Sequence, residues 1–151
     1  MNVTISEGDS FLICNEIGDV LPGKEAGLYG QDTRFLSRYE IFVNDQKPNA
    51  LTGRPVGFHS AVHYLTNAHI DDFPDEALSI ARKRFVGDGL HEDLDVTNHA
   101  LESVSFTLRL EFDADFADIF DVKSGRAHAP AAAGHTADET TRSVVFTYRA
   151  D

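Results

Sequence analysis

The chain has 151 residues, a formal net charge of −12 at pH 7 and a sequence pI near 4.8. A chain of this length fits one domain, which can bury roughly 70% of the surface that its unfolded form exposes. The acidic balance argues against nucleic acid or an anionic membrane surface as a partner, because such partners require clustered Lys and Arg. We therefore predict a single domain over residues 1–151.

The N-terminal region and the cysteine usage predict a location in the cytoplasm. Residues 1–6 (MNVTIS) have no basic start, and no segment approaches the ~20 apolar residues of a membrane-spanning helix. The only cysteine, Cys14, has no partner for an internal disulfide. It follows the apolar run 11–13, so we predict a buried side chain rather than a reactive thiol.

Apolar residues recur at period two along most of the chain, which predicts strands rather than helices. The segments that alternate are separated by Gly, Asp, Asn and Pro, as in antiparallel sheets joined by turns. One of them, 35–43, alternates less strictly, so both of its faces are expected to be partly covered. In chain order, the predicted strands are residues 3–5, 10–15, 35–43, 61–66, 78–86, 90–97, 104–112 and 143–149.

The turn 87–89 (GDG) joins two of these strands and leaves two pairing registers open. A three-residue loop pairs Arg84 with Glu92, whereas a two-residue Asp-Gly turn would place Phe85 opposite Glu92. We favour the first register, because it matches apolar residues at both ends of the hairpin and gives Glu92 a cationic partner. An unpaired carboxylate on that apolar face would carry a heavy desolvation cost. Arg84 and Glu92 are thus predicted to form a structural ion pair, with a catalytic or sugar-binding Glu92 as the alternative.

The clearest alternation places Val104, Phe106, Leu108, Leu110 and Phe112 on one face of a strand and polar residues on the other. One face should therefore be dry and the other wet, as in the sheet of a sandwich. Several antiparallel strands of this kind predict an all-β fold, an antiparallel β-sandwich.

An acidic run and a long connection follow this strand. Asp113, Asp115, Asp118 and Asp121 lack the glycine and the terminal glutamate of an EF-hand, so we predict a solvated strand end that caps a short helical turn. Metal binding is the weaker alternative. The segment 124–141 carries three successive alanines, Gly and Pro without apolar periodicity, and it is predicted to be a flexible loop.

No residue pattern indicates a catalytic, metal or cofactor site. His59 and His63 lie four apart beside a predicted strand, where that spacing separates them by about 13 Å, too far for one metal ion. The chain has no Gly-x-Ser-x-Gly elbow and no phosphate-binding glycine loop. With 25 acidic residues, some pair of carboxylates always looks suitable for glycoside hydrolysis, so no pair is singled out.

Five blocks, in order along the chain, carry a resemblance to a known family. They are residues 6–12 (SEGDSFL), 27–29 (GLY), 32–40 (DTRFLSRYE), 84–92 (RFVGDGLHE) and 112–120 (FDADFADIF), of which the last is the most specific. Together they resemble the non-catalytic N-terminal domain of bacterial and archaeal glycogen debranching enzymes of the amylo-α-1,6-glucosidase type.

The resemblance implies a β-sandwich like those that precede the (α/α)6 barrels of glucoamylase-like hydrolases. It implies a C-terminal catalytic barrel as the partner in the same polypeptide and an α-glucan as the substrate of the parent enzyme. Because domains of the family continue through further strands, the sandwich is expected to be incomplete at its C-terminus, with an exposed strand edge. Catalytic residues would lie beyond Asp151.

Asp32 and Arg34 are the residues that we predict to reach a partner domain or a sugar, because they precede a strand in a turn-rich segment. A local Asp-Arg pair or a turn-capping aspartate is the structural alternative. Two other functions stay open: a stand-alone carbohydrate-binding or interaction module, and a small independent enzyme. The first is weakened by the absence of Trp and the presence of only four Tyr, and the second by the lack of an acid-base pair.

Overall fold

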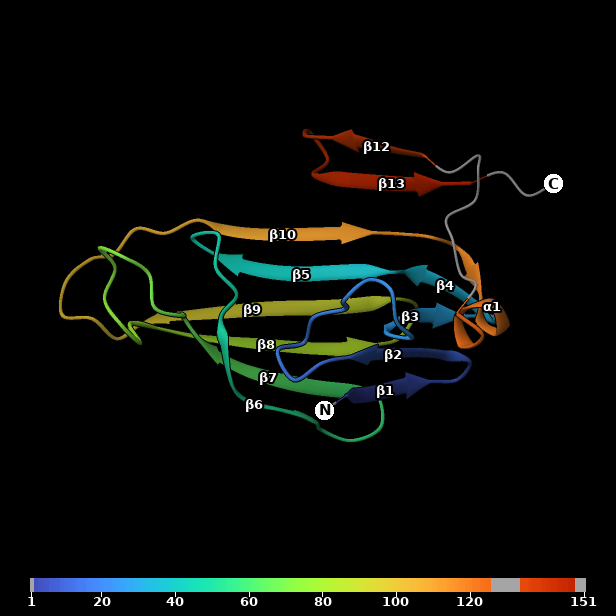
Figure 1. The fold of residues 1–151 in the computed structure, drawn as a ribbon, viewed down its shortest axis with the longest axis horizontal. Helices are drawn as coiled ribbons and strands as arrows, with labels where there is room; N and C mark the ends of the chain where they lie inside the picture. Colours follow the sequence, from blue (N-terminus) through green and yellow to red (C-terminus); the bar gives the residue numbers. More distant parts are fainter. Residues whose placement is uncertain (1, 126–133, 149–151) are drawn as a thin grey trace.

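The computed structural model describes residues 2–125 and 134–148, and within them it contains antiparallel strands and one short helix (Figure 1). The all-β class predicted from the sequence is confirmed. A five-stranded sheet has the order β1 (Val3–Glu7), β2 (Ser10–Cys14), β3 (Gly27–Gly30), β4 (Thr33–Leu36) and β11 (Ala117–Asp118). A four-stranded sheet has the order β6 (Asn49–Pro55), β7 (Ser60–Thr66), β8 (Leu78–Val86) and β9 (Leu90–Asn98). Two separate pairs are β5 (Arg38–Val43) with β10 (Leu108–Asp113), and β12 (Gly134–Asp138) with β13 (Ser143–Thr147).

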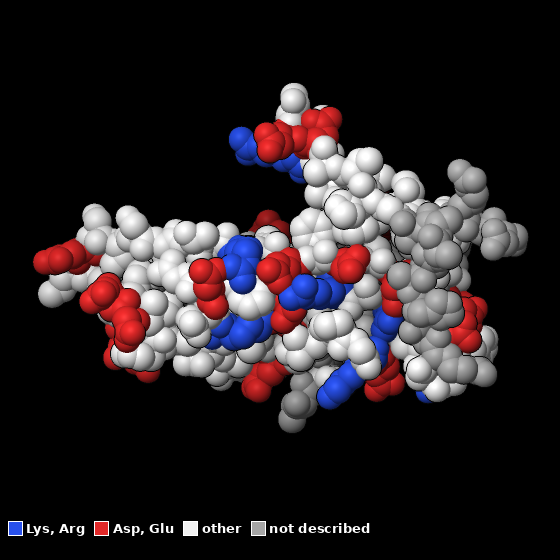
Figure 2. All heavy atoms as spheres, turned by 45° about the horizontal axis from the view of Figure 1, so that its top comes forward, with Lys and Arg blue, Asp and Glu red and all other residues white. Residues whose placement is uncertain are grey.

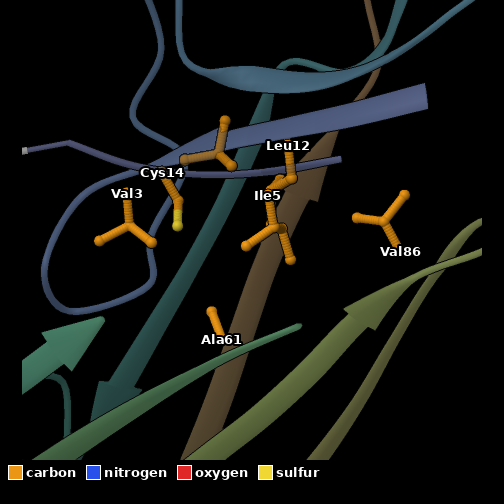
Figure 3. Close-up of a cluster of buried hydrophobic side chains, with 7 residues drawn as sticks. Val3, Ile5, Leu12, Cys14, Ala61 and Val86 are labelled. Carbon is orange, nitrogen blue, oxygen red and sulfur yellow. The ribbon is translucent and has the colours of Figure 1, made fainter. Parts of the chain in front are cut away.

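The sheets pack as a sandwich. The first half of its core lies between the five-stranded and the four-stranded sheets. Figure 3 shows Ile5 and Leu12, from β1 and β2, turned toward Ala61 of β7 and Val86 of β8. Cys14 belongs to the same cluster and is buried, as predicted. Each large aliphatic side chain buried in this way contributes about 1.5–3 kcal/mol relative to an exposed one.

The second half of the core lies where β5 covers the other end of the four-stranded sheet. Ile41 and Val43 of β5 pack there on Leu65 of β7 and Ile80 of β8. Backbone hydrogen bonds of 2.8 and 2.9 Å between Val20 and Tyr39 connect β5 to the segment that joins β2 and β3 of the five-stranded sheet. The five-stranded sheet and the β5–β10 pair therefore form one layer, and the four-stranded sheet forms the other.

The β8–β9 hairpin has the register that we favoured from the sequence. Val86 pairs with Leu90, Arg84 with Glu92 and Ile80 with Val96, without a bulge along the nine pairs. The alternative register, set by a two-residue Asp-Gly turn, is therefore wrong.

The segment 35–43 is two strands rather than the predicted one. The chain leaves the five-stranded sheet after Leu36 and enters β5 at Arg38, and the Ser37 amide between them donates to the Asp113 carbonyl (2.9 Å). Because of this step, Phe35 does not share the buried face of β5, and its side chain is 44% exposed.

The predicted dry face of 104–112 is wrong for its second half. The strand begins only at Leu108, while Val104 and Phe106 approach the core from an irregular segment. Leu108, Leu110 and Phe112 are 36%, 38% and 41% exposed. Arg109 and Glu111, on the polar face, are partly buried, so β10 does not have one buried and one solvated face.

The predicted loop 124–141 contains a strand that the sequence pattern did not reveal. Gly134–Asp138 (β12) pairs with Ser143–Thr147 (β13) to form a hairpin that lies beyond β10 in Figure 1. Alternating apolar residues are missing from β12, and all five of its residues are exposed, so no periodicity could mark it. The part of the predicted loop at 126–133 lies outside the described residues.

Candidate functional site

A layer of charged side chains crosses the core of the sandwich between its two apolar halves. On β8, Arg82 and Arg84 occupy the same inward face as Ile80 and Val86, and both arginines are buried. Glu92 lies opposite them on β9, and fully buried Asp19 approaches from the segment between β2 and β3. We call Asp19, Arg82, Arg84 and Glu92 the charge layer.

Each charge in the layer has an opposite charge in direct contact. Glu92 accepts from Arg84, from Arg82 (3.3 Å) and from the hydroxyl of Tyr39 (2.7 Å). Arg82 Nη1 also donates to Asp19 Oδ1 at 2.7 Å, and the Asp19 carboxylate accepts from Lys47 as well. Arg84 Nη1 donates to the Gly18 carbonyl (2.7 Å). Glu92 thus has the predicted partner, Arg84, and a second arginine that the turn register alone did not indicate.

The arginines of the layer favour the charged form of Glu92. Burial raises the pKa of the Glu92 carboxyl, but the Arg84 and Arg82 guanidinium groups outweigh burial and hold that pKa below its usual value. Burial, together with the negative charge of Glu92, raises the pKa of Tyr39 to about 12. Both shifts move the pKa away from neutral pH, where a general acid or base would titrate. The arrangement suits a buried salt-bridge cluster that fixes strand register.

His63, on β7, lies against the charge layer and is fully buried. Its Nδ1 lies 2.8 Å from the Glu16 carbonyl and its Nε2 lies 3.7 Å from the Cys14 Sγ. Burial and the nearby Arg84 lower the pKa of His63 to about 4. Burial raises the pKa of the Cys14 thiol, so this cysteine is not an activated nucleophile.

Acidification through the range of His63 titration is expected to destabilise the protein. Because the folded-state pKa of His63 is about 4, below the ordinary value of 6.5, its contribution is fully present above pH 6.5 and is lost as pH falls toward 4. A shift of this size corresponds to about 3 kcal/mol in the free energy of unfolding. Urea unfolding of the wild-type protein and the His63→Gln variant between pH 7 and 4 measures this loss of stability. Identical pH dependence in the two proteins would contradict the assignment.

Arg34, on β4, forms a second buried ion pair with Asp115. Its Nε donates to Asp115 Oδ1 (3.1 Å), Nη2 contacts Oδ2, and Nη1 donates to the carbonyls of Lys24 (2.6 Å) and Ala26 (3.3 Å). Asp115 is 9% exposed, so the prediction that it belongs to a solvated acidic strand end is wrong. The physical reason is Arg34, which lies 81 residues away along the chain and compensates the buried charge. Asp118 does cap the short helix α1 (Ile119–Lys123), as predicted.

Asp32 lies at the exposed turn between β3 and β4, apart from Arg34's ion pair. Gln31 and Asp32 have φ of 50° and 61°, the left-handed conformations of a type I′ hairpin turn. The Asp32 carbonyl accepts from the Ile119 amide (2.8 Å). Its carboxylate makes no hydrogen bond or ion pair with the residues that the structure describes. A local Asp32–Arg34 pair is therefore wrong, and Asp32 is a turn residue.

Two pockets lie beside the two buried ion-pair sites. A polar cleft of about 660 Å³ is lined by Lys24, Arg34, Ser37, Asp115 and Lys123, among others. An apolar groove of about 330 Å³ is lined by Phe35, Tyr39, Leu90, Glu92, Phe112 and Phe146, among others. On the face shown in Figure 2, acidic and basic side chains alternate rather than forming a patch of one sign.

Within residues 2–125 and 134–148, no group of three His, Cys, Asp or Glu side chains is arranged to hold a metal ion. No helix in the same ranges is long and apolar enough to span a membrane. The cytoplasmic location predicted from the sequence stays a prediction.

Comparison with known proteins gives one family. The family model for the N-terminal domain of some glycogen debranching enzymes matches residues 5–151, nearly the whole chain. No curated protein matches the sequence.

Proposed function

Because the chain belongs to the family of N-terminal domains of glycogen debranching enzymes, we propose that it is a non-catalytic module that packs on a catalytic domain of the same polypeptide. The family match over residues 5–151 is the observation that carries the proposal. The two buried ion-pair sites support it, because their carboxylates are occupied by arginines and hold the sandwich together.

In more detail, the partner is a C-terminal (α/α)6 barrel with amylo-α-1,6-glucosidase activity on an α-glucan, and this domain shapes one wall of its cleft. The catalytic acid and base belong to that barrel. The module itself supplies a rigid β surface, and it needs no cofactor.

Asp32 and Arg34 have different parts in this proposal. The exposed Asp32 carboxylate is the group that reaches the partner domain or the sugar. Arg34 acts as a positioning residue: it ties β4 to Asp115 and to the carbonyls of the segment 24–26, which form the wall of the polar cleft.

The proposal is tested by comparing the full-length polypeptide with the 151-residue chain on a glucan that carries α-1,6-linked branches. We expect glucose release by the full-length protein and no turnover by the 151-residue chain. Turnover by the chain alone would make it an independent enzyme. Retarded migration of the chain in glycogen-containing gels, with no activity in the full-length protein, would favour the stand-alone carbohydrate-binding module.

Replacing Asp32 with asparagine in the full-length enzyme is expected to lower kcat/KM about tenfold, the loss of one hydrogen bond to a charged group. Asparagine tolerates the left-handed backbone, so the melting temperature should not change. Asp72→Asn is the matched control, because Asp72 is an exposed aspartate with φ of 63° in a different loop. An unchanged kcat/KM for Asp32→Asn would remove Asp32 from the substrate or domain interface.

A further inference from the structure

The inner face of β10 is built like a core face but is left open. Leu108 pairs with Val43 and Leu110 with Ile41, and directly opposed residues of paired strands share one face of the sheet. Val43 and Ile41 are fully buried, whereas Leu108 and Leu110 are 36% and 38% exposed. The same face of the sheet is therefore buried on β5 and partly exposed on β10.

The cause is a lateral offset between the two layers of the sandwich. The four-stranded sheet ends at β9, and β5 lies over it, so that Ile41 and Val43 have β7 and β8 beneath them. No strand of the described chain lies beyond β9 to support β10. Phe146 of β13 contacts Phe112 (ring centroids 5.9 Å apart), yet Phe112 remains 41% exposed. The hairpin β12–β13 thus covers only one end of the open face.

The free edge of β9 has a regular backbone, in contrast to the opposite edge of the same sheet, although β9 carries the charged residues Glu92, Asp93 and Asp95. The edge strand β6 carries a bulge between Ala50 and Thr52 and ends in Pro55, two features that block the addition of a strand. β9 has nine regular pairs with β8, no proline and no bulge. Val96, on its inward face, is 37% exposed. A long regular edge beside an uncovered apolar face is the geometry that accepts another strand.

We propose that a strand of the polypeptide that follows this domain adds to the free edge of β9 and packs under the inner face of β10. The inference rests on the proposed function, which supplies the following polypeptide. Alternate residues of the added strand are apolar and contact Leu108, Leu110 and Phe112. The intervening residues, next to Asp93 and Asp95 on the outward face of β9, are basic or uncharged.

A second copy of the chain is the poorer occupant of this edge. Antiparallel pairing of two β9 strands centred on Leu94 would place Asp93 of each copy opposite Asp95 of the other. Like charges directly opposite one another destabilise a pair of strands. Each copy also carries a net charge of −12, which opposes self-association.

The test compares two leucines that are both exposed in this structure, Leu110 on β10 (38%) and Leu51 on β6 (63%). In the full-length polypeptide, Leu110→Lys is expected to lower the melting temperature by about 5 °C or more, because lysine would be buried under the added strand. Leu51→Lys, at the protected edge, should leave the melting temperature unchanged. Equal effects of the two substitutions would overturn the proposal.

Hydrogen exchange and sedimentation of the same full-length proteins give independent readouts. The β9 amides that point away from β8 are expected to be protected in the wild type and to exchange faster in Leu110→Lys. Fast exchange of these amides in the wild type overturns the proposal, as does a dimer that Leu110→Lys converts to a monomer. If the β9 amides are protected but the polypeptide has no glucosidase activity, the added strand is supported and the proposed function is contradicted.

Discussion

Replacing Glu92 with glutamine is expected to lower the free energy of unfolding by about 3–5 kcal/mol, the cost of breaking a buried ion pair from one side. Glutamine has nearly the shape of glutamate, so the change removes charge without leaving a cavity. Both arginines are buried, and without the Glu92 charge Arg82 would keep only the Asp19 carboxylate and Arg84 only the Gly18 carbonyl. Urea unfolding at pH 7 of the wild type and the variant measures the difference.

Asp95→Asn is the control for this experiment. Asp95 is also on β9 and also pairs with a cation of β8, Lys83 (2.9 Å), but both side chains of that pair are more than half exposed. Exposed pairs contribute little because water and salt screen them. We expect no measurable change for Asp95→Asn. A similar small change for Glu92→Gln would mean that the charge layer does not hold the sandwich together.

The Asp115→Asn variant is expected to lose about 3 kcal/mol of stability, because Arg34 would be left buried with only backbone carbonyls as partners. The loss should be accompanied by greater mobility of the segment 24–26, whose carbonyls Arg34 holds. Thermal unfolding measures the first effect, and hydrogen exchange of residues 24–30 measures the second.

Asp121→Asn is the matched control, since Asp121 belongs to the same acidic run but lies in the first turn of α1. A carboxylate at this position interacts with the helix N-terminus, which is worth less than about 1 kcal/mol. If both substitutions destabilise the protein equally, then the Arg34–Asp115 pair has no special part in the fold.

Local patterns predicted the fold well where neighbouring strands follow each other in the chain. The β8–β9 hairpin is the example, because its turn and the alternation of Val86, Arg84, Leu90 and Glu92 are enough to set the register. The charge layer also left a signal in the sequence. Arg82 and Arg84 lie in phase with Ile80 and Val86, so two arginines on an apolar face already indicated more than one buried pair.

What the sequence could not show depends on contacts between distant segments. Asp115 looks like one more solvated aspartate until the fold brings Arg34 beside it. The step at Ser37 depends on a hydrogen bond to Asp113 and leaves no mark in the alternation of 35–43. Alternation shows that one face of β10 is apolar, but it cannot show whether a second layer covers Leu108 and Leu110.

The most direct test of the central claim is to read the natural coding sequence downstream of the codon for Asp151. Membership in a family of N-terminal domains leads us to expect that the reading frame continues. The account predicts a strand with alternating apolar residues, followed by several hundred helix-rich residues that carry paired carboxylates. A stop codon directly after Asp151 would contradict both the packing on a catalytic domain and the added strand on β9.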